Sequence, residues 1–187
     1  MTLHRILNRS LWYFRLRKIP SPALLTSIWF VAVAVLFLQA PGQAADKFKP
    51  FKLKTLDGTA KTLQDYAGKA TLVSFFFPSC PYCNAAFPEV QKLHDRHKDQ
   101  GLVAVWINVV PDENKKIPDW LEKNQFTIPV LIGASQASLQ RDYKLKMTPT
   151  HYLLNPQGEI LFTHAGYEKG DEVELEQVVQ KALDIAP

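Results

Sequence analysis

Cys80 and Cys83 are the only two cysteines of the 187-residue chain, and Pro81 and Tyr82 separate them. Residues 72–77, just before the pair, form an apolar, aromatic-rich run that predicts a buried strand. After the pair, apolar residues recur at the three- and four-residue spacing of a helix. Two cysteines at this spacing, between a strand and a helix, are typical of a dithiol that exchanges with disulfides.

The chemistry of the pair depends on the helix that follows it. Cys80 precedes the first helical turn, where unpaired backbone N–H groups and the helix dipole favour a thiolate. Pro81 suits the first helical position, because an N–H there would have no partner within the helix. Cys83 falls on the same helical face, within reach of a disulfide with Cys80. We therefore expect Cys80 to attack a partner disulfide and Cys83 to resolve the mixed disulfide.

A structural disulfide and half of a zinc site are the two alternative uses of the pair. A bridge across so short a loop constrains the unfolded chain little, so it would add little stability. A zinc site usually needs four ligands, and His94 and His97 would have to leave the predicted helix to supply two of them. A redox pair is the better explanation, and we expect no metal and no cofactor.

The basic character of the chain lies in its first 45 residues. The sequence has 22 Lys and Arg against 18 Asp and Glu, which gives a formal net charge of +4. Five basic residues and no acidic residue precede position 45, so 17 basic residues face 18 acidic ones in the remainder. A nearly neutral remainder does not favour nucleic-acid binding, and we expect none.

Residues 1–45 have the pattern of an export signal. An apolar run over residues 23–38 follows the basic residues, and small Gly42 and Ala44 occupy the positions that a signal peptidase favours. Cleavage after Ala44 would release a soluble domain, whereas residues 23–40 approach the length of a membrane anchor. In both cases the positive charges stay in the cytoplasm. We therefore expect a periplasmic or otherwise extracytoplasmic domain, either soluble or anchored in the inner membrane.

Residues 46–187 are predicted to form one α/β domain. Asp57-Gly58 between two alternating segments is a strong hairpin signal, and residues 111–116 are expected to be a charged loop. The predicted order is a hairpin, a strand–helix–strand unit, a short helix, a second hairpin and a closing helix, which predicts a central mixed sheet with helices on both faces. These elements cover, in turn, residues 51–63, 72–110, 118–124, 150–164 and 171–185.

The domain resembles the thioredoxin superfamily and, within it, the exported TlpA/ResA-like thiol–disulfide oxidoreductases, whose domains are of the redoxin or AhpC/TSA type. The resemblance covers nearly everything from Phe51 to the end of the chain. It implies a thioredoxin-like fold with an extra N-terminal β-hairpin and an inserted helix. The features that carry it are Asp57-Gly58, Gly68-Lys69, the Cys80 and Cys83 motif, Pro88, the helix near Trp120 and residues 143–150.

The resemblance also implies the composition of the site. Pro149 stands where the family has a cis-proline that faces the cysteine pair, in keeping with the low cis penalty of a bond to proline. Thr148 would then present its backbone to an extended substrate, which Pro81 and Tyr82 would also contact. The implied catalytic residues are Cys80, Cys83 and Pro149, and the implied substrate-binding residues are Pro81, Tyr82 and Thr148.

The resemblance favours a reductase of exported protein disulfides that is itself kept reduced by a membrane electron donor of the thiol–disulfide interchange type. A disulfide-introducing oxidase of the same fold is the alternative, because the direction depends on the reduction potential. Ser74 and Ala86 stand where relatives carry buried acids that handle the proton of the resolving thiol. Glu89, Tyr82 or a water molecule are the candidates for that task.

Two other functions fit the sequence less well. A peroxiredoxin would need a threonine three residues before its reactive cysteine, where this chain has Phe77. A copper-binding assembly factor would use both cysteines and a distant histidine, such as His151 or His164, but its cysteines are generally separated by three residues. We instead expect these histidines to be polar residues of the last hairpin, with His94 and His97 on the face of the first helix.

Overall fold

The computed structural model describes residues 46–186, so the predicted signal peptide or anchor within residues 1–45 lies outside the described range. No helix within residues 46–186 is long and apolar enough to cross a bilayer. The strands are β1 (Lys52–Thr55), β2 (Ala60–Thr62), β3 (Ala70–Phe76), β4 (Leu102–Asn108), β5 (Val130–Ile132), β6 (Thr150–Leu154) and β7 (Ile160–Ala165). The α-helices are α2 (Pro81–His97), α3 (Ile117–Asn124), α4 (Gln136–Tyr143) and α5 (Asp171–Ile185), and the 3-10 helices are η1 (Leu63–Tyr66), η2 (Lys98–Gln100) and η3 (Pro111–Lys116).

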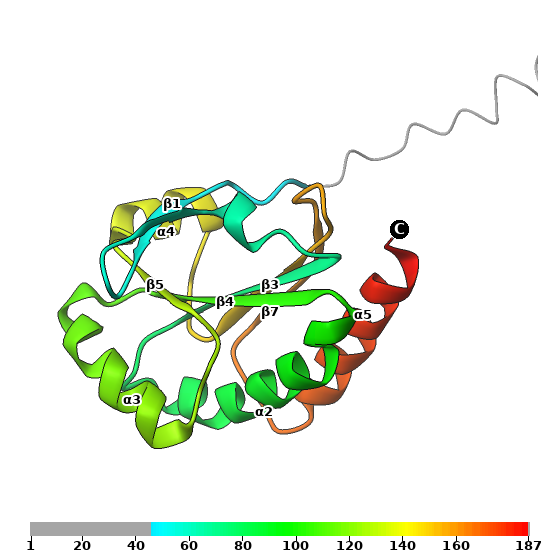
Figure 1. The fold of residues 1–187 in the computed structure, drawn as a ribbon. Coiled ribbons are helices and arrows are strands. Elements are labelled where there is room, and N and C mark those ends of the chain that lie inside the picture. Colours follow the sequence, from blue (N-terminus) through cyan, green and yellow to red (C-terminus); the bar gives the residue numbers. More distant parts are fainter. Residues whose placement is uncertain (1–45, 187) are drawn as a thin grey trace, which may run out of the picture. The chain divides into compact units, whose positions relative to one another are not determined.

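The strands form one mixed sheet in the order β2-β1-β5-β4-β3-β6-β7. Helices α2, α3 and α5 cover one face of this sheet, and α4 lies on the other face (Figure 1). The predicted α/β architecture, a central mixed sheet with helices on both faces, is therefore confirmed.

The N-terminal hairpin predicted around Asp57-Gly58 pairs β1 with β2 in antiparallel register. Gly58 has a φ of 88°, a left-handed conformation that glycine adopts without steric cost. Strand β1 also pairs with β5, so the hairpin extends the central sheet at one edge.

Strands β3 and β4 form the parallel centre of the sheet, and α2 connects them. All seven residues of β3 are buried, which explains its continuous apolar run, because a strand covered on both faces has no solvent-facing side. Strand β6 runs antiparallel to β3 on its other side, and β7 pairs with β6. The carboxyl ends of β3 and β4 meet at one edge of the sheet, and Cys80 lies just beyond that end of β3.

Apolar cores fill both sides of the sheet. Under α2, α3 and α5 the aromatic rings of Phe76, Phe87, Trp106 and Trp120 pack together, with the centroids of Phe87 and Trp106 4.4 Å apart. The other side is filled by residues of β3, β4 and α4 and of the segment before β1. These cores hold the helix that begins at the cysteine pair firmly against the sheet.

The expectation of a charged loop at residues 111–116 was wrong, because this segment forms η3. Pro111 occupies its first turn, where the fixed φ of proline suits a helix. Acidic residues stand in the first turn and Lys115 and Lys116 in the last, an order that complements the helix dipole. Helix η3 continues directly into α3, the helix that was predicted at residues 118–124.

Candidate active site

Cys80 is the N-cap of α2, with an extended backbone and Pro81 at the first helical position. The backbone N–H of Cys83 donates a hydrogen bond to the sulfur of Cys80 over 3.2 Å, and Asn84 N–H donates to the Cys80 carbonyl over 3.0 Å. The first turn of the helix thus directs one of its otherwise unpaired donors at the sulfur. Donors at this place stabilise a thiolate more than a thiol.

Cys83 lies deeper than its neighbours and is fully buried. Burial, and then the adjacent sulfur of Cys80, raise the pKa of the Cys83 thiol well above its ordinary value. Both cysteines are in the reduced form. The pair is therefore asymmetric: the sulfur of Cys80 receives a backbone donor, whereas Cys83 is held as a neutral thiol.

The Thr148–Pro149 segment faces the pair, although 68 residues separate Thr148 from Cys80. The peptide bond between Thr148 and Pro149 is cis, as expected from the sequence. The Thr148 hydroxyl donates to the sulfur of Cys80 over 3.4 Å, and the Cys80 thiol donates to the Thr148 carbonyl oxygen over 3.7 Å. The Pro149 carbonyl accepts a 2.7 Å hydrogen bond from Gly166 N–H, which ties this segment to the chain after β7.

The remaining predicted site residues lie at the surface around Cys80. Pro81 is exposed, and Tyr82 has 61% of its surface accessible. A groove beside Thr148 is lined by Tyr82, Met147 and Tyr167 among others. The structure thus brings Cys83 and Thr148 against the sulfur of Cys80, with Pro149 next to Thr148, and places Tyr82 and Thr148 in the groove.

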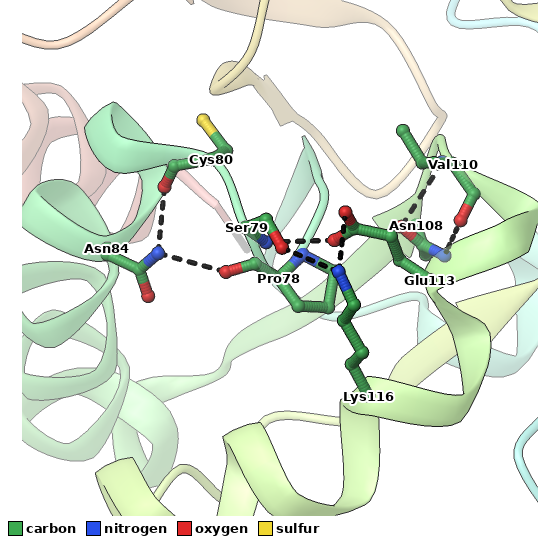
Figure 2. Close-up of polar contacts among 8 residues, drawn as sticks. All are labelled: Pro78, Ser79, Cys80, Asn84, Asn108, Val110, Glu113 and Lys116. Carbon is green, nitrogen blue, oxygen red and sulfur yellow. Dashed lines mark hydrogen bonds and ion pairs between the residues drawn. The ribbon is translucent and has the colours of Figure 1, made fainter.

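Residues that were not predicted hold the loop before Cys80 in place (Figure 2). Ser79 N–H donates to Glu113 Oε2 over 2.9 Å, and Lys116 Nζ donates to Ser79 Oγ over 2.9 Å. Lys116 and Glu113 also form an ion pair of 3.1 Å. Burial by itself would raise the pKa of Glu113. The hydrogen bonds from Ser79 and Lys116 outweigh this effect, so the pKa of Glu113 is lowered. The sequence signal was the position of these charges after β4, whose carboxyl end lies beside that of β3.

Asn84 fixes the start of α2 from the other side. Its side-chain amide donates to the carbonyls of Pro78 and Cys80, each over 2.9 Å (Figure 2). The indole of Trp120 donates to Asn84 Oδ1 over 2.7 Å, so the inserted helix α3 is connected to the cysteine motif. The sequence marked Trp120 as part of the insertion but gave no sign of this contact.

His151 lies in the last hairpin, as expected, but it is buried there. Its side chain is 3% exposed, and its Nδ1 lies 2.8 Å from the hydroxyl of Ser74, its partner in the β3–β6 register. Burial lowers the pKa of His151 to about 4, so the imidazole is neutral near pH 7. A neutral ring with one partner hydroxyl can be buried at modest cost, which a charged ring cannot.

None of the other histidines within residues 46–186 has a hydrogen bond to either cysteine. His164 pairs with Asp171 over 2.9 Å, and His97 is buried beside Glu176 of α5. His94, on the same helix as His97, is half-buried. Across residues 46–186, no three His, Cys, Asp or Glu side chains are grouped in a way that could hold a metal ion.

Comparison with known proteins gives related sequences and structures over this domain. The Redoxin family matches residues 43–179. Sporulation thiol-disulfide oxidoreductase A of Bacillus subtilis is 28% identical over 145 residues, 73% of this chain and 87% of the relative. Thioredoxin-like protein YneN of Bacillus subtilis is 31% identical over 138 residues, 73% of this chain and 78% of the relative. The crystal structure of StoA from Bacillus subtilis superposes with a TM-score of 0.57 at 25% identity, covering 71% of this chain and 97% of that one.

Proposed function

The chain belongs to the Redoxin family and has a thioredoxin-like fold, and on this basis we propose that it is an exported thiol–disulfide oxidoreductase that reduces disulfides of exported proteins. Relatives named as thiol-disulfide oxidoreductases support this class of chemistry. The observation that carries the proposal is the asymmetric dithiol. Hydrogen-bond donors from Cys83 N–H and from Thr148 point at the sulfur of Cys80, while Cys83 is a buried thiol.

The reaction begins when the Cys80 thiolate attacks one sulfur of a disulfide in the partner protein. A bond forms between Cys80 and that sulfur, and the partner's second sulfur leaves as a thiolate that takes up a proton from solvent. Cys83 then loses its proton and attacks the sulfur of Cys80, which releases the first partner sulfur as a thiolate. The partner ends as a dithiol, and Cys80 and Cys83 end as a disulfide that an external dithiol must reduce.

The asymmetry of the pair supports one order of attack. Cys80 is 2% exposed, but two donors are aimed at its sulfur and the next two residues, Pro81 and Tyr82, are exposed, which supports Cys80 as the thiol that meets a partner as a thiolate. Burial raises the pKa of Cys83, which keeps it protonated until the mixed disulfide has formed. Cys80 is therefore the attacking thiol and Cys83 the resolving thiol.

Four further residues bind the partner in this proposal. The Thr148 backbone pairs with an extended substrate segment, and Pro149 shapes that segment beside the cysteines. Pro81 and Tyr82 contact the substrate from the exposed side of α2, across the groove from Tyr167. The groove is open, which suits a protein chain better than a small enclosed ligand.

Export and direction complete the proposal. Residues 1–45, with a basic start and an apolar run, direct the domain across the membrane either as a cleaved signal or as an anchor through residues 23–40. Outside the cytoplasm the electrons come from a membrane donor of the thiol–disulfide interchange type. The domain is therefore placed in the periplasm or another extracytoplasmic space.

Two measurements on the full chain test this function. The reduction potential of the Cys80/Cys83 couple, equilibrated against glutathione and dithiothreitol, should lie near or below about −270 mV for a reductase, and a value near about −120 mV would instead indicate an oxidase. In cells, the Cys83→Ser variant should accumulate mixed disulfides with partner proteins. The matched Cys80→Ser variant should not, and trapping by that variant would contradict the assigned order of attack.

A further inference from the structure

We propose that Glu113 and Lys116 form a charge-balanced clamp that positions Cys80 and adjusts its reactivity through Ser79. The inference rests on the proposed function, because it assigns control of the same thiol. Both side chains reach from η3 to Ser79, the residue immediately before Cys80 (Figure 2). Their polar contacts are with Ser79 and with each other, so they are positioning residues that act through the loop.

Ser79 is held by two of its groups at once. Its backbone N–H donates to Glu113 Oε2 over 2.9 Å, and its hydroxyl accepts from Lys116 Nζ over 2.9 Å. The ion pair of 3.1 Å between Glu113 and Lys116 closes the triangle. The Glu113 side chain is only 15% exposed, whereas that of Lys116 is 50% exposed, so water screens the carboxylate less.

The clamp is attached to the sheet, which allows it to fix a position. Asn108, the last residue of β4, is 1% exposed, and its side-chain amide donates to Asn114 Oδ1 and to the Val110 carbonyl, each over 2.7 Å. The bond to Asn114 fastens η3 to the end of β4, and Figure 2 shows the bond to Val110, the residue before η3. Asn84 holds the same loop from the side of α2. The residues leading into Cys80 are thus pinned between two rigid elements.

The clamp carries two opposite charges close to the cysteine loop. A carboxylate disfavours a nearby thiolate and an ammonium favours it, so the effects of Glu113 and Lys116 on Cys80 offset each other while both are present. Removing one charge leaves the other uncompensated. Cys83 and Tyr82 of α2 and the titratable groups of the groove beside Thr148, namely His164, Tyr167, Glu168 and Asp171, stay the same in either case.

This arrangement predicts effects of opposite sign for two single variants. Glu113→Gln keeps an oxygen that can accept from Ser79 N–H but removes the negative charge, so the Cys80 thiolate becomes more favourable. In a Cys83→Ser background, alkylation of Cys80 by iodoacetamide at pH 6 should become about two- to threefold faster. With both cysteines present, the equilibrium with glutathione should shift towards the dithiol by at most the same factor, which corresponds to about 9–14 mV. Lys116→Met should produce the reverse of both changes.

Two controls separate this clamp from a general charge effect. Asp112→Asn and Lys115→Met make the same charge changes on η3 at residues that make no hydrogen bond to Ser79, and both should leave the rate and the equilibrium unchanged. The double variant Glu113→Gln/Lys116→Met should return close to the wild-type values.

Several results would overturn the proposal. If Glu113→Gln and Lys116→Met changed the alkylation rate in the same direction, the clamp would only hold the loop in place. If Asp112→Asn and Lys115→Met changed the rate as much as these two variants do, the contact with Ser79 would be irrelevant. Alkylation reports on the clamp even if the wild-type chain failed to reduce protein disulfides. Failure of the clamp and failure of the proposed function are therefore distinguishable.

Discussion

Replacing Thr148 with Val removes the hydroxyl that points at the sulfur of Cys80. Within residues 46–186 two donors are directed at that sulfur, the Thr148 hydroxyl at 3.4 Å and Cys83 N–H at 3.2 Å. A hydrogen bond to a charged group contributes about 1.5–3 kcal/mol, and this one should be worth about 1 kcal/mol because it is long and Thr148 is partly exposed to water. A loss of about 1 kcal/mol lowers the equilibrium constant for thiol ionisation roughly fivefold.

The assay is alkylation of Cys80 by iodoacetamide in the Cys83→Ser background. At pH 6, Thr148→Val should react about fivefold more slowly than the parent, because alkylation proceeds through the thiolate that this hydroxyl stabilises. The difference between the two rates should shrink as the pH is raised. Thr148→Ser keeps the hydroxyl and should react like the parent. Equal rates for the Val and Ser variants at pH 6 would refute a role for this hydroxyl.

The remaining predictions concern the stability of the fold that carries the site. Phe87→Ala removes a fully buried ring that packs against Trp106 and Trp120. It should lower the free energy of unfolding, measured by urea titration, by about 3–5 kcal/mol. A loss below about 1 kcal/mol would mean that the core collapses around the gap. His151 has a pKa of about 4 in the folded chain against about 6.5 when unfolded, so the unfolded state binds more protons between these values. The contribution of the neutral His151 to the free energy of unfolding is complete above about pH 6.5. It is lost as the pH falls towards 4, a change of about 3 kcal/mol. A His151→Gln variant should show a flatter dependence between pH 7 and 5, and an unchanged slope would contradict this account.

Local signals predicted much of the domain correctly. The alternation on either side of Asp57-Gly58 predicted the β1–β2 hairpin, because a tight turn and a two-residue period act within a few residues. The apolar run before Cys80 predicted β3, and the position of the pair predicted that α2 would begin there. The resemblance to thioredoxin-like proteins supplied the cis bond before Pro149, which lies far from the cysteines in the sequence.

The sequence was least informative where distant segments decide the environment of a residue. Residues 111–116 have the charges and the proline of a loop, but the structure makes them η3 and fastens them to β4 through Asn108. His151 is polar and stands in a hairpin, yet the register of β3 and β6 places it against Ser74 beneath α2. Periodicity describes a short window of sequence and not the contacts between separate strands and helices, so it could not identify the contact with Asn108 or the contact with Ser74.

The sequence by itself determined the reactive chemistry of this protein, because two cysteines three residues apart at a helix start are a local feature and need only the strand before them and the helix after them. The tertiary structure decided how that chemistry is controlled. Thr148 reaches Cys80 from 68 residues away, and the clamp reaches Ser79 from η3 because parallel strands place their carboxyl ends at one edge of the sheet. Burial of Cys83 and His151, which shifts the pKa of each, likewise results from the packing of helices onto the sheet and is not encoded in any short segment.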